Sequence, residues 1–400
     1  MTGLIGICLL PVIAWLLSTD RKAVNWRTVG GAFGFQVAVG AAALYLPPGR
    51  ALLEWVADGA SRVLDYSLVG IEFVFGSLAS DSMGYIFAFR VLPVIISFSA
   101  LIAVLYYLRV MTWVVRIFGG LLQRALRSSR PESISAAANV VVGMVDAPLV
   151  VRPFIATMTR SELFAVMVGG LATVAGSVMA GYAAAGIEFK YLIAASFMAA
   201  PGGLMMAKLM LPETDEPMND IPDLDEGRPV NIFDAAGNGA MLGLRIALAV
   251  GAMLIAIIGL IALLNGIIGW LGGFAGAPDL TFQQIIGWLF MPVAWITGVP
   301  WSEAAQAGSF IGQKLVLNEF VAYLDFAPHI SELSEGTVVI VTFALCGFAN
   351  FGSVAILLGG LSAIAPNRRE DVARLGMRAL VAATLANLMS ASLAGVFVCL

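Results

Sequence analysis

The chain has 400 residues, of which 60% are hydrophobic and 12% are charged. Soluble globular domains carry about 25% charged residues, so about half of the expected charge is missing. This composition excludes a soluble globular protein, and the formal net charge of −4 argues against a nucleic-acid partner.

Apolar segments of about 20 residues, the length that crosses the hydrocarbon core of a bilayer, recur along the chain. We expect eight spans, near residues 2–18, 26–46, 84–108, 161–185, 189–210, 239–268, 337–362 and 371–398. The first span lacks a basic leader and a small-residue cleavage site, so we interpret it as a retained helix. Residues 49–64 and 111–127 alternate apolar and polar side chains at helical spacing, which is typical of interfacial helices. The second segment could equally be a cytoplasmic extension of the third span.

Two parts of the chain have the same order of segments. Each begins with two apolar arms that are too short to span, continues with an interrupted span, and ends with a second span. The short arms predict re-entrant hairpins, which are tolerated where their backbone is buried in protein or lines a cavity. We place the first turn at residues 143–148 and the second near Gly308, Gly312 and Gln313.

The order of segments predicts four regions. Residues 1–130 form scaffold helices with an interfacial helix, 131–211 the first transport half-unit, 212–290 a cytoplasmic loop and a scaffold helix, and 291–400 the second transport half-unit. One span separates the half-units, so we predict an inverted-topology repeat. If the N-terminus faces outward, most arginine and lysine clusters lie on the cytoplasmic side, and both termini lie outside the cytoplasm.

The polar residues of the half-units are the candidates for a binding site. Asp146 and Glu319 lie within the two hairpins, and a carboxylate at membrane depth costs roughly 2.5–3.5 kcal/mol on insertion scales. Either could instead pair with an arginine near the interface. We favour a functional role because both lie beside a helix break.

The interrupted spans carry related phrases, GLATVAGSV at residues 170–178 and GFANFGSV at residues 347–354. Asn139, Thr173, Asn350 and Ser353 surround the breaks. Each could simply bridge helices by hydrogen bonding. Together, an amide, a hydroxyl and unwound carbonyls suit a small hard cation such as Na⁺. The sequence has neither a Walker loop nor a nucleophile triad, so we expect a secondary transporter and no enzyme.

The chain resembles the concentrative nucleoside transporter family, of the bacterial type, over essentially its whole length. The resemblance is carried by long stretches such as SAAANVVVG, ELFAVMVGGLATVAGSVMAGYA, KLVLNEFVAYL and CGFANFGSVAILLGG. It implies an all-α polytopic membrane protein with eight transmembrane helices and two re-entrant hairpins. It also implies a homotrimer in the lipid of the bacterial inner membrane, which imports nucleosides by cation symport with an elevator movement.

The resemblance also implies roles for individual residues. The family's ribose-binding residues fall on Glu319, Asn350 and Ser353, with Phe348 as the aromatic nearby and Val178 as an apolar contact of the base. The family's sodium site falls on Asn139, the carbonyls of Val142 and Val174, and the hydroxyl of Thr173. Na⁺ is therefore the expected coupling ion, and no organic cofactor is expected.

The nucleobase side departs from the family, which typically has Gln-Thr-Glu where this chain has Met144, Val145 and Asp146. The change removes an amide and a hydroxyl and shortens the carboxylate. Because polar matching gives large discrimination, we expect an altered base preference. Two alternatives stay open: proton coupling through Asp146, and a passive nucleoside channel. A membrane-embedded enzyme is less favoured, because the sequence offers neither a nucleophile nor a metal cluster.

Overall fold

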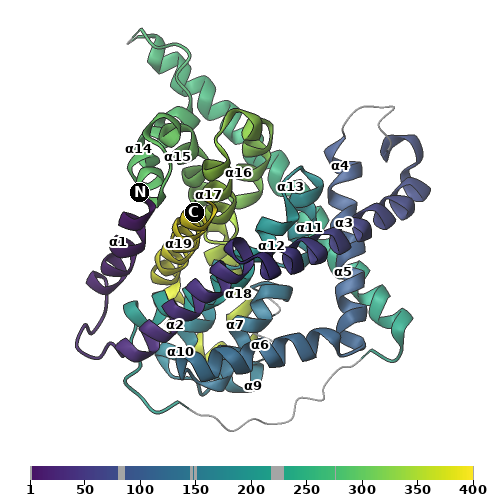
Figure 1. Cartoon of the computed structure of the whole chain (residues 1–400). Helices are drawn as coiled ribbons and strands as arrows, with labels where there is room; N and C mark the ends of the chain where they lie inside the picture. Colours follow the sequence, from purple (N-terminus) through teal and green to yellow (C-terminus); the bar gives the residue numbers. More distant parts are fainter. Residues whose placement is uncertain are drawn as a thin grey trace.

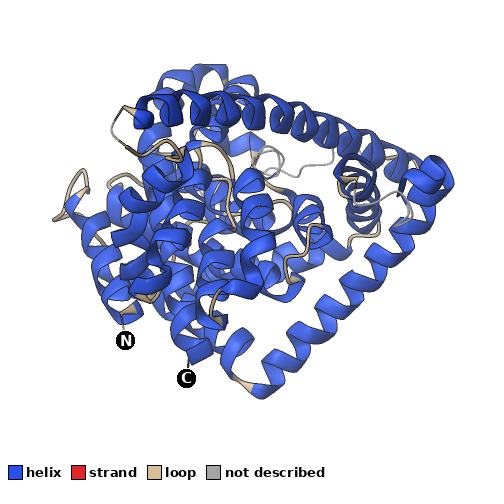
Figure 2. Ribbon diagram, turned by 90° about the horizontal axis from the view of Figure 1, so that it is seen from above, coloured by secondary structure: helices blue, strands red, loops and turns tan. Residues whose placement is uncertain are grey.

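The computed structural model describes residues 2–79, 86–144, 147, 151–217, 229–274 and 276–399, and the regular elements drawn there are helices (Figures 1 and 2). The first half of the chain contains α1 (Gly3–Leu16), α2 (Trp26–Gly40) with a π-helical turn η1 (Ala41–Tyr45), α3 (Pro47–Phe75), η2 (Gly76–Ala79), α4 (Phe87–Arg90), α5 (Leu92–Tyr107), α6 (Val110–Leu126), α7 (Arg130–Val142), α9 (Arg152–Ile155), α10 (Arg160–Ala172), α11 (Gly176–Ala184) and α12 (Phe189–Met210).

The second half contains α13 (Ile232–Gly273), α14 (Phe282–Thr297), α15 (Trp301–Val316), α16 (Glu319–Phe326), η4 (Ala327–Glu332), α17 (Glu335–Leu345), α18 (Phe351–Ile364), η5 (Pro366–Arg368) and α19 (Arg369–Cys399). The helices that the sequence predicts near 49–64 and 111–127 are α3, which extends to Phe75, and α6.

The starts of several helices follow from local sequence. Capping boxes begin α7, α10 and α14, with the pairs Ser129 and Glu132, Thr159 and Glu162, and Thr281 and Gln284. In each box the hydroxyl accepts from the backbone of the first turn, and the longer side chain accepts from the backbone of the cap. These helix ends are therefore defined by the chain itself, whatever the surrounding lipid.

The described helices divide by burial into a packed core and a surrounding set. Residues 160–184 and α12 are almost wholly buried within the protein, whereas α13 buries about one residue in six. The buried residues of α13 include Gly239, Gly243 and Ala247, spaced one helical turn apart. Gly239 and Gly243 let α13 approach the backbone of α5 closely, since a Cβ on either would lie within 2.9 Å of it. Figure 2 shows long helices bordering the central bundle.

Six helices of the described chain are long and apolar enough to cross a membrane, or seven if the bent pair α14–α15 is counted as one. The expected spans near 2–18 and 337–362 are not among the six. The helix α1 has only 14 residues, and the second segment is broken into α17 and α18. The protein is a multi-pass helical membrane protein, and the exact count of eight spans stays a prediction.

The predicted turn of the second hairpin is wrong. Gly308, Gly312 and Gln313 lie inside α15, and the chain turns by 114° earlier, at residues 298–300 between α14 and α15. The next break, at residues 317–318, separates α15 from α16. A Cβ on Gly308 would lie 2.8 Å from the carbonyl oxygen of Gly287 on α14. Gly308 and Gly312 therefore allow close packing of α15 on α14. In the sequence, glycines with this role look the same as glycines in a turn.

We expect Gly308→Ala to destabilise the protein by about 1–3 kcal/mol, because overpacking forces backbone or side chains apart. Gly259→Ala on α13 is the matched control, since its Cβ would meet nothing within 4 Å. Thermal unfolding in detergent measures both. Equal melting temperatures for the two variants would contradict the packing role of Gly308.

The order of elements repeats along the chain. In each half a long helix (α5, α13) is followed by a helix (α6, α14), a hairpin arm (α7, α15), a broken helix (α10–α11, α17–α18) and a long closing helix (α12, α19). In the first hairpin, residues 145–146 and 148–150 lie outside the described residues, and α9 follows them. The two ends of the chain lie together: a Cβ on Gly3 would contact Val396 (Figure 1).

Candidate functional site

Both interrupted spans are broken helices, and the two breaks touch. The helix α10 ends at Ala172 and α11 begins at Gly176, while α17 ends at Leu345 and α18 begins at Phe351. Thr173 has an extended backbone between its two half-helices. The backbone N–H of Phe348 donates to the carbonyl oxygen of Thr173 at 3.2 Å. The paired phrases in the sequence therefore mark one crossing point in the core.

Glu319 lies at this crossing, at the first residue of α16. It is 5% exposed. Its Oε1 accepts a hydrogen bond from the hydroxyl of Tyr182 at 3.0 Å, and its Oε2 accepts one from Nδ2 of Asn350 at 2.9 Å. The N-terminal end of a helix favours negative charge, so α16 also stabilises the carboxylate. The structure thus brings Glu319 and Asn350 together.

Two helix caps orient the polar groups of the site. Asn350 caps α18, with its Oδ1 accepting from the backbone N–H of Ser353 at 2.8 Å. Asn318 caps α16 in the same way, accepting from the backbone N–H of Val321 at 2.8 Å. Each amide keeps its NH₂ free to bond elsewhere, and that of Asn350 meets Glu319. The caps therefore hold both amides in one rotamer.

These groups border a cavity of about 400 Å³, which is large enough for a small organic molecule. One wall comes from α13 and contains aliphatic side chains and Met253. The other comes from the hairpin arms and the broken helices. Seven residues that the sequence predicts for the site line it: Val142, Met144, Val178, Glu319, Phe348, Asn350 and Ser353. The other two predicted base contacts, Val145 and Asp146, lie outside the described residues.

The residues predicted to hold a cation lie next to the cavity. Asn139 is fully buried; its Nδ2 donates to the carbonyl of Ser135 at 3.0 Å, and its Oδ1 has no partner. The hydroxyl of Thr173 donates to the carbonyl of Gly169 at 2.9 Å, which leaves its oxygen lone pairs available. A buried oxygen without a partner is costly, and a cation would satisfy it. The donor set of amide, hydroxyl and carbonyl oxygens fits Na⁺.

The end of α7 and the first helix break are in contact. Gly143 has φ +87°, and a Cβ there would lie 2.8 Å from the Cβ of Ala175. A Cβ on Gly176 would lie 3.2 Å from the carbonyl oxygen of Val141. The carbonyls of Val142 and Val174 therefore belong to segments that meet, as the predicted sodium site requires.

Sequence reasoning missed two parts of the site. The first is Tyr182, which donates a hydrogen bond to Glu319. Its only signal in the sequence is a hydroxyl within the apolar second half, α11, of the broken helix that contains Thr173. The wall formed by α13 has no polar signal, because Leu242, Ile246 and Val250 look like ordinary lipid-facing residues. Such a wall is identified only once the packing of α13 is known.

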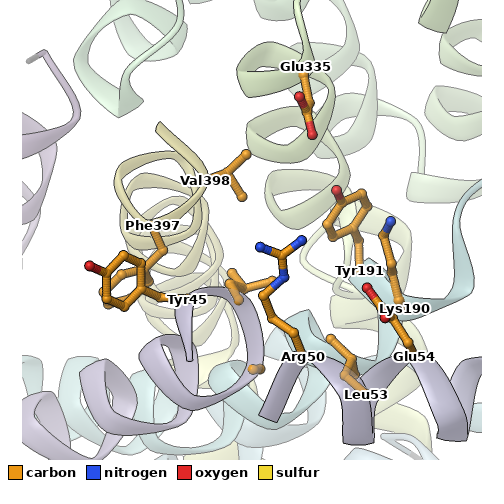
Figure 3. Close-up of a pocket in the computed structure, with 11 residues that line it drawn as sticks. Tyr45, Arg50, Leu53, Glu54, Lys190, Tyr191, Glu335, Phe397 and Val398 are labelled. Carbon is orange, nitrogen blue, oxygen red and sulfur yellow. The ribbon is translucent and has the colours of Figure 1, made fainter. Parts of the chain in front are cut away.

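A second cavity, of about 250 Å³, is polar and lies away from the helix breaks (Figure 3). Arg50 and Glu54 reach it from α3, Lys190 from α12 and Glu335 from α17. Glu335 is exposed, unlike Glu319. None of the residues predicted for the site lines this cavity, so Glu335 provides a carboxylate with which Glu319 can be compared.

The fold and this site define a class of protein: a polytopic membrane transporter with broken helices beside a cavity. Family models match nearly the whole chain. They are described as Na⁺ dependent nucleoside transporter N-terminus (residues 5–78), nucleoside recognition (residues 88–189) and Na⁺ dependent nucleoside transporter C-terminus (residues 191–395). The chain belongs to the concentrative nucleoside transporter family. The relatives that it matches are transporters and permeases, not enzymes.

Relatives are similar over the full chain. An uncharacterized transporter of Haemophilus influenzae is 54% identical, covering 100% of this chain and 98% of that protein. The nucleoside permease NupC of Helicobacter pylori is 47% identical, covering 99% and 97%. The sodium/nucleoside cotransporter 1 of Mus musculus is 37% identical over 98% of this chain and 63% of its own length.

Solved structures agree with the fold. CNTnw in an inward-facing substrate-bound state is 56% identical, covers 99% of this chain and 97% of its own, and superposes with a TM-score of 0.96. A CNTnw variant in an outward-facing state is 55% identical, covers 99% and 98%, and gives a TM-score of 0.97. Relatives of this fold are therefore known in inward- and outward-facing states, which supports alternating access.

Proposed function

We propose that this protein imports nucleosides by coupling their movement to an inward Na⁺ gradient. The hydrogen-bonded pair Glu319 and Asn350 at the rim of the cavity carries the proposal. A carboxylate and an amide together can accept from and donate to the vicinal hydroxyls of a ribose. Ser353 adds a hydroxyl on the same helix as Asn350.

The base would occupy the less polar part of the cavity. Val178 and Met144 line that part with aliphatic and thioether groups, and Phe348 offers an aromatic ring. With Val145 and Asp146 beside Met144 in the sequence, this chain offers fewer hydrogen-bonding groups to the base than the family's Gln-Thr-Glu. We therefore propose a base preference that differs from that of family members with the Gln-Thr-Glu sequence.

Na⁺ would bind to Asn139, Thr173 and the carbonyl oxygens of Val142 and Val174. The unpartnered Oδ1 of Asn139 supports this assignment. The ion supplies positive charge that holds the end of α7 against the first helix break. Because the same break contacts the second one through Phe348, ion binding and nucleoside binding would favour one arrangement of both half-helices.

Movement would follow an elevator scheme, in which the half-units 131–211 and 291–400 carry the ligand past scaffold helices in regions 1–130 and 212–290. Residues 160–184 are almost wholly buried within the protein, whereas most of α13 is not. This difference supports a division into a moving transport part and a surrounding scaffold. We also propose a homotrimer in the bacterial inner membrane, with both termini outside the cytoplasm. Native mass spectrometry tests the trimer, with an expected mass three times the 42.0 kDa of one protomer.

Uptake by proteoliposomes tests the function. Labelled uridine should accumulate above its external concentration with a Na⁺ gradient, but not with choline at the same pH. Competition by a panel of nucleosides then ranks the bases. Accumulation driven equally well by a proton gradient would favour proton coupling through Asp146. Equilibration without accumulation would favour a passive channel, and no uptake of any nucleoside would contradict the proposal.

A further inference from the structure

Two buried polar side chains outside the cavity join the two helix breaks. Lys314 on α15 is 2% exposed, and its ammonium donates to the carbonyl of Ala344 at 3.1 Å and to Oδ1 of Asn387 at 2.7 Å. Asn387 on α19 donates through Nδ2 to the carbonyls of Ala172 at 2.7 Å and Cys346 at 3.1 Å. One amide therefore bonds to the C-terminal ends of both α10 and α17.

Lys314, Asn387 and the carbonyls that they bond form a cluster, and its chemistry makes it rigid. An ammonium buried without partners is very costly, so Lys314 depends on the oxygens that it meets. The C-terminal ends of helices carry partial negative charge, which favours a cation there. The approach is also close: a Cβ on Gly347 would collide with Asn387 and would lie 2.7 Å from the carbonyl oxygen of Ala172. The two half-helices can thus shift little relative to one another while these bonds persist.

The cluster is adjacent in the chain to both proposed ligand sites. Ala172 directly precedes Thr173 of the cation site, and the second break continues from Cys346 to Asn350 of the nucleoside site. Lys314 lies on α15, the arm that leads to Glu319. Neither Lys314 nor Asn387 lines the nucleoside cavity.

We infer that Asn387 and Lys314 are positioning residues that couple the cation site to the nucleoside site by tying the ends of α10 and α17 to one another. The inference rests on the proposed function. An ion that orders residues 173–175 also orders, through the bonds of Asn387, the segment that presents Asn350. Coupling of this kind is a difference in binding free energy, so each ligand raises the affinity for the other by the same factor.

The isosteric variant Asn387→Asp tests the inference. Its carboxylate still accepts from Lys314 but no longer donates to Ala172 and Cys346. Calorimetry on the purified protein measures uridine affinity in Na⁺ and in choline. The ratio of the two affinities, about tenfold or more in the natural protein, should fall to about twofold, while affinity in choline stays nearly unchanged. The ratio of the sodium affinities measured with and without uridine should fall by the same factor.

Ser390→Ala is the matched control. Ser390 lies one turn along α19, and its buried hydroxyl accepts from Gln36 at 2.9 Å and donates to the carbonyl of Ala386, neither of which belongs to a break. It should lower stability without changing the affinity ratio. A folded Asn387→Asp protein with an undiminished ratio would overturn the inference. If the natural protein itself shows no effect of Na⁺, the proposed function fails instead.

A measurement on the natural protein covers the case in which Asn387→Asp does not fold. Hydrogen–deuterium exchange of residues 345–353 is followed with Na⁺ alone, without nucleoside. The inference predicts several-fold slower exchange of this segment, although the ion binds at the other break. Slowing confined to residues 139–144 and 173–176 would overturn it.

Discussion

Glu319→Gln is expected to abolish nucleoside uptake while leaving the protein folded. Glu319 accepts from both Tyr182 and Asn350, and a Gln keeps only one acceptor oxygen and turns an NH₂ group toward a donor. Hydrogen bonds to charged groups contribute about 1.5–3 kcal/mol each, so loss of the carboxylate should reduce uptake by about 100-fold or more. Initial rates in proteoliposomes, normalised to the amount of inserted protein, measure the effect.

Glu335→Gln is the matched control for this experiment. It makes the same chemical change in the exposed cavity between α3, α12 and α17 (Figure 3). Uptake should remain within about twofold, because exposed charges contribute little. If Glu319→Gln transports as well as Glu335→Gln does, the assignment of the nucleoside site is wrong.

The second large effect is expected at the cation site. Thr173→Val keeps the shape of the side chain and removes its oxygen, so the concentration of Na⁺ that gives half-maximal uptake should rise roughly tenfold or more. The maximal rate at saturating Na⁺ should change less, because the nucleoside contacts stay. A titration of uptake against Na⁺ at constant ionic strength separates the two parameters.

Thr342→Val on α17 controls for the loss of a buried hydroxyl. Thr342 donates to the carbonyl of Val338 at 2.8 Å, much as Thr173 donates to that of Gly169 at 2.9 Å. Thr342 takes no part in the predicted cation site, so its replacement should leave the sodium dependence unchanged. Equal shifts in both variants would show that the hydroxyl of Thr173 acts only within its helix.

Much of the architecture could be predicted because membranes impose strong rules on sequence. Helix breaks inside apolar spans were predicted from Thr173 and Asn350, since a polar group beside a Gly-Ser pair is unusual at that depth. The membrane-spanning class, the family and the two breaks are confirmed. The residue roles at the site stay predictions, although Glu319 and Asn350 lie within hydrogen-bonding distance.

The rest could not be predicted for a physical reason. Glycine serves both turns and close helix packing, so Gly308 and Gly312 indicated a turn where α15 packs on α14. Long-range polar contacts leave no periodic pattern, so the bonds of Asn387 to two helix ends were not foreseen. A buried lysine such as Lys314 likewise looks in sequence like any charged residue near a hairpin.

The asymmetry of the cavity walls has a consequence for release of the cargo. The wall formed by α13 consists of Leu242, Ile246, Ala249, Val250, Met253 and Ile257. None of these side chains offers a strong hydrogen bond, so a solute separating from this helix gives up dispersion contacts and gains hydration. In the proposed elevator movement, the barrier to sliding along this apolar wall would depend little on the chemistry of the solute. Selectivity would then be decided on the opposite wall, before the proposed movement begins.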